Sequence, residues 1–93
     1  MTLAEIRPQI DALNRELLTL FERRMALCRE VALEKQRTGG EVFVPEREKA
    51  ILDWVDAAAD PALGEYDHCF FETLLSLSRN YQHSILSGGS SEE

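Results

Sequence analysis

The sequence predicts an all-α fold of three helices, in which the first helix is much longer than the other two. Apolar residues recur in steps of three and four from the start of the chain, which is the period of an amphipathic helix. Glycine and proline gather at residues 37–45 and 60–64, and such clusters mark loops between periodic segments. No stretch has the pattern of a convincing strand, because "EVFV" is short and isolated.

The first predicted helix covers residues 3–36, and Thr2 and Glu5 have the spacing of a capping box at its start. Pro8 removes a backbone donor, so we expect a bent or irregular first turn, not a break. About 34 residues span roughly 50 Å, whereas a compact domain of this size has a radius of gyration of about 13 Å. An isolated chain cannot bury so long an apolar row. An intertwined homodimer, in which the long helices of two chains pair, is the simplest way to cover it.

The second predicted helix begins near Pro45, a favoured first position, and has Glu46 and Glu48 in its first turn. It ends at the 60–64 loop, and a third helix covers residues 65–86. We expect these helices to form one domain, residues 1–87, followed by a polar, disordered tail at 88–93.

The composition excludes several classes of function. The 93 residues carry a net charge of −7, which argues against nonspecific nucleic-acid binding and against adhesion to anionic membranes. No apolar run is long enough to span a bilayer and no leader opens the chain, so a cytoplasmic location is expected. No cysteine or histidine cluster and no phosphate-binding loop occurs, and the sequence therefore predicts neither a metal nor a cofactor.

Polar side chains interrupt the apolar rows where core residues are expected. Arg24 continues the row that runs from Leu20 to Leu27, and a buried guanidinium is costly unless an anion satisfies it. The other members of this set are Arg7, Lys35, Arg47, Glu48, Ser78 and Gln82. Singly, each has a plain explanation, such as snorkelling to water or a bond back to a helix carbonyl. Together they predict a pocket for a small, partly apolar polyanion with a hydroxyl group, where any chemistry depends on orientation and electrostatics.

The residues that carry this pattern also resemble a known family. The segments "IRPQIDALNRELLTLFERR", "EVALEK", "PERE" and "SLSRNYQ" resemble the all-helical chorismate mutases, and the likeness covers residues 3–86. It implies a cofactor-free Claisen rearrangement of chorismate to prephenate in aromatic amino-acid biosynthesis. It further implies an intertwined homodimer in which each pocket borrows one arginine from the partner subunit.

The resemblance gives four residues a role either in binding the carboxylates of the substrate or in completing the pocket of the partner subunit. Arg7 is similar to the arginine that is lent to the partner's pocket. Arg24 resembles the carboxylate clamp supplied within the subunit, and Arg47 resembles a further pocket arginine. Ser78 matches a residue that lines the carboxylate site.

Four more residues are assigned to the reacting bond and to the ring hydroxyl. Lys35 and Gln82 match residues that hydrogen-bond the ether oxygen as its bond breaks, so they are the expected catalytic residues together with Arg24. Glu48 matches the carboxylate that holds the ring hydroxyl. Val44 stands where many relatives have an aspartate that helps to hold the same group.

Two alternatives stay open at the level of sequence. Isochorismate-pyruvate lyase shares this fold and much of the pocket, although the full "PERE" and "SRNYQ" set favours the mutase. A noncatalytic dimerisation or regulatory domain belongs to another class of function. A domain that only dimerises would favour Leu or Ala at position 24, so the presence of Arg24 argues against a noncatalytic domain.

Overall fold

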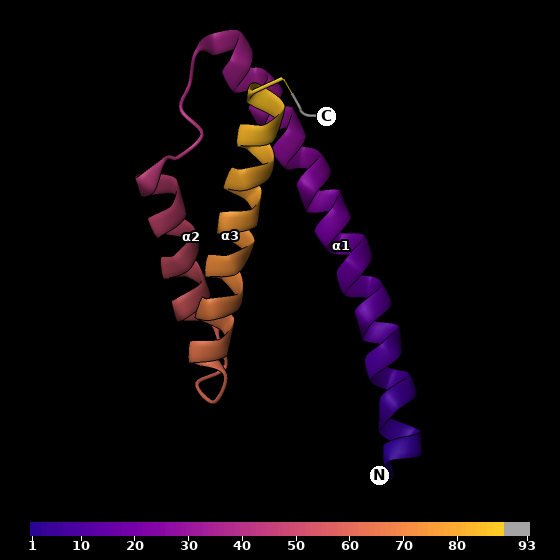
Figure 1. The fold of residues 1–93 in the computed structure, drawn as a ribbon. Helices are drawn as coiled ribbons and strands as arrows, with labels where there is room; N and C mark the ends of the chain where they lie inside the picture. The colour runs from indigo at the N-terminus through magenta and orange to yellow at the C-terminus, as the bar shows by residue number, and fades with distance from the viewer. Residues whose placement is uncertain (89–93) are drawn as a thin grey trace.

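A computed structural model, which describes residues 1–88, confirms the predicted all-helical fold of three helices (Figure 1). They are α1 (Leu3–Thr38), α2 (Pro45–Ala58) and α3 (Gly64–Leu86). No strand occurs in this part of the chain, and the segment "EVFV" belongs to the loop between α1 and α2. Residues 89–93 of the predicted tail lie outside the described residues.

The start of α1 is better ordered than the sequence predicts. Thr2 Oγ1 accepts a hydrogen bond from the Glu5 amide at 3.3 Å, and Glu5 Oε1 accepts one from the Thr2 amide at 2.7 Å. This reciprocal capping box confirms the expected cap. The expected irregular first turn is wrong, because the helix passes through Pro8 without interruption. The fixed φ of proline is itself helical, and the affected turn lies exposed on the surface.

Helix α3 holds the domain together. It packs against α1 on one side and against α2 on the other, whereas α1 and α2 do not pack directly on each other within residues 1–88 (Figure 1). The buried apolar core is small and consists of Ala32, Val42, Val55, Leu74 and Leu75. Ser78 and Gln82 are also buried, as expected for polar residues that interrupt an apolar row.

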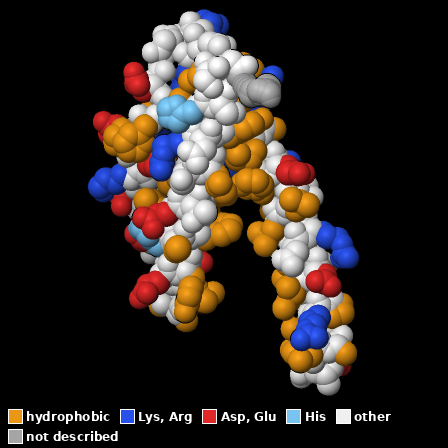
Figure 2. Space-filling model, viewed as in Figure 1, with side chains coloured by type: hydrophobic (Ala, Val, Ile, Leu, Met, Phe, Trp, Pro, Cys, Tyr) orange, Lys and Arg blue, Asp and Glu red, His pale blue; other side chains and the backbone are white. Residues whose placement is uncertain are grey.

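The N-terminal half of α1 projects away from the rest of the chain (Figure 1). The described structure extends 53 Å along its longest axis, and its radius of gyration is 16.6 Å, compared with about 13 Å for a compact domain of this size. Leu13, Leu17 and Leu20 are 57%, 52% and 55% exposed. Figure 2 shows hydrophobic side chains on both sides of the opening between α1 and α3. Among the described helices, none is long and apolar enough to cross a membrane.

Candidate active site

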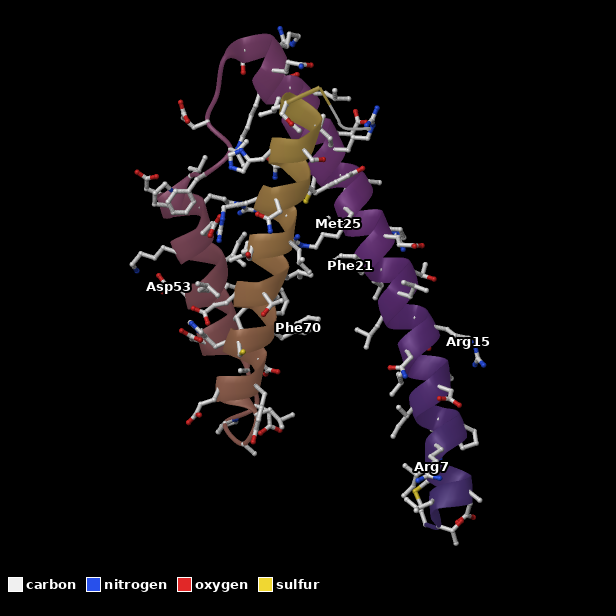
Figure 3. All side chains as sticks on the ribbon, viewed as in Figure 1. Arg7, Arg15, Phe21, Met25, Asp53 and Phe70 are labelled. Atoms are coloured by element: carbon white, nitrogen blue, oxygen red, sulfur yellow. The ribbon has the colours of Figure 1, made fainter. Side chains whose placement is uncertain are left out.

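One cavity, with a volume of about 180 Å³, brings together residues from all three helices and from the loop that joins α1 to α2. Its lining consists of Arg24, Cys28, Val31, Lys35, Val42, Val44, Arg47, Glu48, Ile51, Leu75, Ser78, Arg79 and Gln82. This list contains seven of the eight residues that the sequence singled out. Arg7 is the exception. It lies exposed near the free end of α1, as Figure 3 shows.

Arg24 is held along one edge of its guanidinium group. Nη1 donates a hydrogen bond of 2.5 Å to Ser78 Oγ and a weak one of 3.8 Å to Cys28 Sγ. Ser78 Oγ in turn donates to the carbonyl of Leu74 at 2.8 Å, so the hydroxyl is fixed as an acceptor for the arginine. Nε and Nη2 of Arg24 have no partner within residues 1–88. The guanidinium is therefore oriented by the protein and keeps donors for an anionic ligand.

Lys35 joins the last turn of α1 to the following loop. Its Nζ donates a hydrogen bond of 3.0 Å to the carbonyl of Val42, which is itself buried. This contact is possible because Gly39, the residue that caps the C-terminus of α1, adopts the left-handed conformation with φ 81° and turns the chain back toward the helix. An ammonium group has three donors, so two of them stay available at the wall of the cavity.

Gln82 is a buried amide with an unused polar atom. The residue is 8% exposed, and its Oε1 has no hydrogen-bond partner in the described part of the chain. Buried polar atoms are nearly always paired, because an unpaired one loses its bonds to water without replacement. The two ends of the amide have similar shapes, so half a turn about its last bond would bring Nε2 to the unpaired position. A polar group of a ligand would satisfy either arrangement.

Arg79 is the charged lining residue of the cavity that the sequence analysis did not single out. Its Nη1 donates to Glu48 Oε1, and its guanidinium carbon lies 5.4 Å from the centroid of the Phe43 ring. Lys49, which follows Glu48 in the sequence, pairs with Asp53 instead. The signal for Arg79 was its place in "SRNYQ", directly after Ser78.

The cavity is strongly basic within an acidic chain. Four cations line it, namely Arg24, Lys35, Arg47 and Arg79, and Glu48 is the one carboxylate among its described lining residues. Apolar side chains such as Val31, Ile51 and Leu75 form the rest of the wall. Within residues 1–88, no group of three or more His, Cys, Asp or Glu side chains is arranged to hold a metal ion. The arrangement can bind a small organic anion and surround its apolar part.

The fold and this cavity define a helical domain with a basic, partly apolar cavity lined by all three of its helices. The chain belongs to the chorismate mutase type II family, whose model matches residues 6–83.

Individual relatives support the same assignment over shorter segments. The chain is 42% identical over 50 residues to a protein named T-protein from Haemophilus influenzae, which is 54% of this chain and 13% of that protein. It is 43% identical over 51 residues to a protein named chorismate mutase from Methanocaldococcus jannaschii, which is 55% of this chain and 52% of that protein. The matched segment thus spans 13% of the length of the first relative and about half of the length of the second. No solved structure matches the chain significantly.

Proposed function

We propose that this protein catalyses the Claisen rearrangement of chorismate to prephenate in aromatic amino-acid biosynthesis. Membership of the family and the likeness to a protein named chorismate mutase support the proposal. The observation that carries it is the single cavity in which Arg24, Lys35, Arg47, Glu48 and Gln82 meet. We expect the reaction to take place in the cytoplasm.

In this mechanism the arginines bind the substrate and fold it. Arg24, oriented by Ser78, takes one carboxylate through its free Nε and Nη2 donors, and Arg47, from α2, supplies further positive charge in the same cavity. Glu48 accepts the hydrogen bond of the ring hydroxyl. Holding a flexible dianion in its compact reactive shape removes much of the entropic barrier of a unimolecular rearrangement.

Lys35 and Gln82 act on the bond that breaks. Negative charge grows on the ether oxygen in the transition state, so donors aimed at that oxygen bind the transition state more strongly than the substrate. The free donors of the Lys35 ammonium and the amide of Gln82, turned so that Nε2 faces the ligand, supply these bonds. Losing one such donor typically raises the barrier by about 3–4 kcal/mol.

We also propose that the active enzyme is an intertwined homodimer, in which Arg7 enters the pocket of the partner subunit. The exposed apolar row of α1 supports the dimer, because leucines that are more than half exposed would lie against a second chain. Arg7 precedes Arg24 by 17 residues on one rigid helix, a separation of about 25 Å. It therefore cannot reach its own cavity, whereas a partner helix that crosses α1 brings an equivalent arginine close.

The direct test of the activity is the loss of chorismate absorbance, followed by separation of the products. Formation of prephenate by the wild-type chain, and its loss in Lys35→Ala, would support the mutase. Formation of pyruvate and an aromatic acid from isochorismate would assign the lyase activity instead. If a folded dimer converts neither chorismate nor isochorismate, the protein is a noncatalytic dimerisation or regulatory domain.

Mixed dimers test the shared pocket. Inactive Arg7→Ala chains are refolded together with inactive Arg24→Ala chains, and mass spectrometry confirms the mixed species. In a mixed dimer one pocket combines Arg24 from the first chain with Arg7 from the second, and it is intact. Random pairing makes about half of the dimers mixed, so about one pocket in four regains activity. If Arg7 served its own subunit, mixing would restore nothing.

A further inference from the structure

Arg79 is a cation of the cavity to which the proposed mechanism gives no role. It projects from α3, pairs with Glu48 in the first turn of α2, and lies against the ring of Phe43 in the loop. One side chain thus connects three separate elements of the cavity wall. Because Glu48 neutralises its charge and Phe43 covers one of its faces, Arg79 is less free to bind an anion than Arg24.

The pair determines which part of Glu48 faces a ligand. Arg79 binds Oε1, and Oε2 has no side-chain partner within residues 1–88. The Glu48 side chain is only 18% exposed, so its charge is held in a restricted space between two helices. A glutamate has three rotatable bonds, and an ion pair with good geometry removes much of that freedom. Oε2 is then the acceptor that stays available.

Glu48 Oε2 is the carboxylate oxygen on which recognition of a ligand hydroxyl in this cavity depends. Val44, which contributes no acceptor in its side chain, also lines the cavity, and Glu48 is the one carboxylate among the described lining residues. A site that hydrogen-bonds a hydroxyl discriminates strongly against an analogue that lacks it, because the buried acceptor is then left unpaired. The strength of that discrimination follows from how firmly the acceptor is held.

We propose that Arg79 is a positioning residue that sets the selectivity of the pocket for the ring hydroxyl, by fixing Glu48 so that Oε2 meets that group. This inference rests on the proposed function. It differs from a role in anion binding, because Arg79 acts on the substrate only through Glu48. It also differs from a purely structural role, because it predicts a change in selectivity and not a uniform loss of activity.

The test compares chorismate with an analogue that lacks the ring hydroxyl but keeps the rearranging enol ether. For Arg79→Gln, we expect kcat/KM for chorismate to fall roughly ten- to a hundredfold, mainly through KM, since a bond to a charged acceptor is lost in substrate and transition state alike. For the analogue, we expect kcat/KM to change less than about threefold. Arg79→Lys keeps a cation beside Glu48, and it should restore part of the selectivity.

Two further variants make the result specific. Arg37→Gln removes an exposed arginine that pairs with Glu34 on the surface of α1, and it should change neither substrate's kinetics. The selectivity is the ratio of kcat/KM for chorismate to kcat/KM for the analogue. When Glu48→Gln is already present, adding Arg79→Gln should change this ratio less than about threefold, because the effects of two residues that act through one contact are not additive.

Equal losses for both substrates in Arg79→Gln would overturn the inference, and so would independent effects of Arg79 and Glu48. If Arg79→Gln does not fold, the ratio measured for Arg79→Lys decides, because an unchanged ratio there contradicts positioning by this pair. A wild-type protein that converts neither compound would overturn the proposed function, and this inference would fall with it.

Discussion

Leu17→Ala is expected to weaken the proposed dimer about thirtyfold. Leu17 is 52% exposed and borders an apolar groove together with Phe21, Phe70 and Leu74. Complete burial of a leucine contributes about 1.5–3 kcal/mol, so covering the exposed half contributes about 1 kcal/mol. A two-fold dimer contains the residue twice, which gives about 2 kcal/mol per dimer and roughly a thirtyfold larger Kd. An unfilled cavity at the interface would add to this value.

Sedimentation equilibrium over a series of protein concentrations measures that constant. Arg15→Ala is the matched control on the same helix, because Arg15 is exposed and points away from α3 (Figure 3). Its Kd should equal that of the wild type. A wild-type chain that stays monomeric at every concentration would refute the reasoning, and so would equal effects of the two substitutions.

Three other perturbations have defined outcomes. Gln82→Glu should be active mainly at acidic pH, because a glutamate donates a hydrogen bond only when protonated, and a flat pH–rate profile would remove Gln82 from the reaction centre. Arg24→Leu should abolish turnover and leave the melting temperature unchanged or higher. Unfolding of that variant, with a wild-type melting temperature that does not respond to chorismate analogues, would make Arg24 structural. The hydrogen bond of His68 to Asp56, 2.8 Å long, raises the pKa of His68 above 6.5, with Glu72 contributing further. The folded state therefore binds the proton more tightly, and the stability from this pair is present below about pH 6.5 and lost as the pH rises through the folded-state pKa. Chemical denaturation at several pH values should show this loss in the wild type and not in His68→Gln.

The ends of the helices were predictable because local signals determine them. The capping box at Thr2, the paired glycines after Thr38 and the proline at the start of α2 each act within a few residues. The effect of Pro8 was misjudged for a related reason. A missing donor in an exposed turn costs less than the same loss inside a packed helix, and the sequence alone does not tell the two apart.

The cavity was only partly predictable. The positions of Arg24, Ser78 and Gln82 followed from helical periodicity, since each interrupts an apolar row that has to face the core. The partner of Glu48 did not follow in the same way, because Arg79 is 31 residues away and comes from another helix. Periodicity tells which face of a helix is buried, but not which side chains of two helices meet.

The lack of direct packing between α1 and α2 has a consequence for the stability of the domain. Where two neighbouring helices would normally share a core, these two meet only as contributors to the cavity, which α1 lines with Arg24 and α2 lines with Arg47. A ligand that binds both arginines supplies the missing contact and becomes part of the interior of the protein. An unreactive dicarboxylate should therefore slow hydrogen exchange in both helices together. At one hundred times its Kd it would add about 2.7 kcal/mol to the free energy of unfolding.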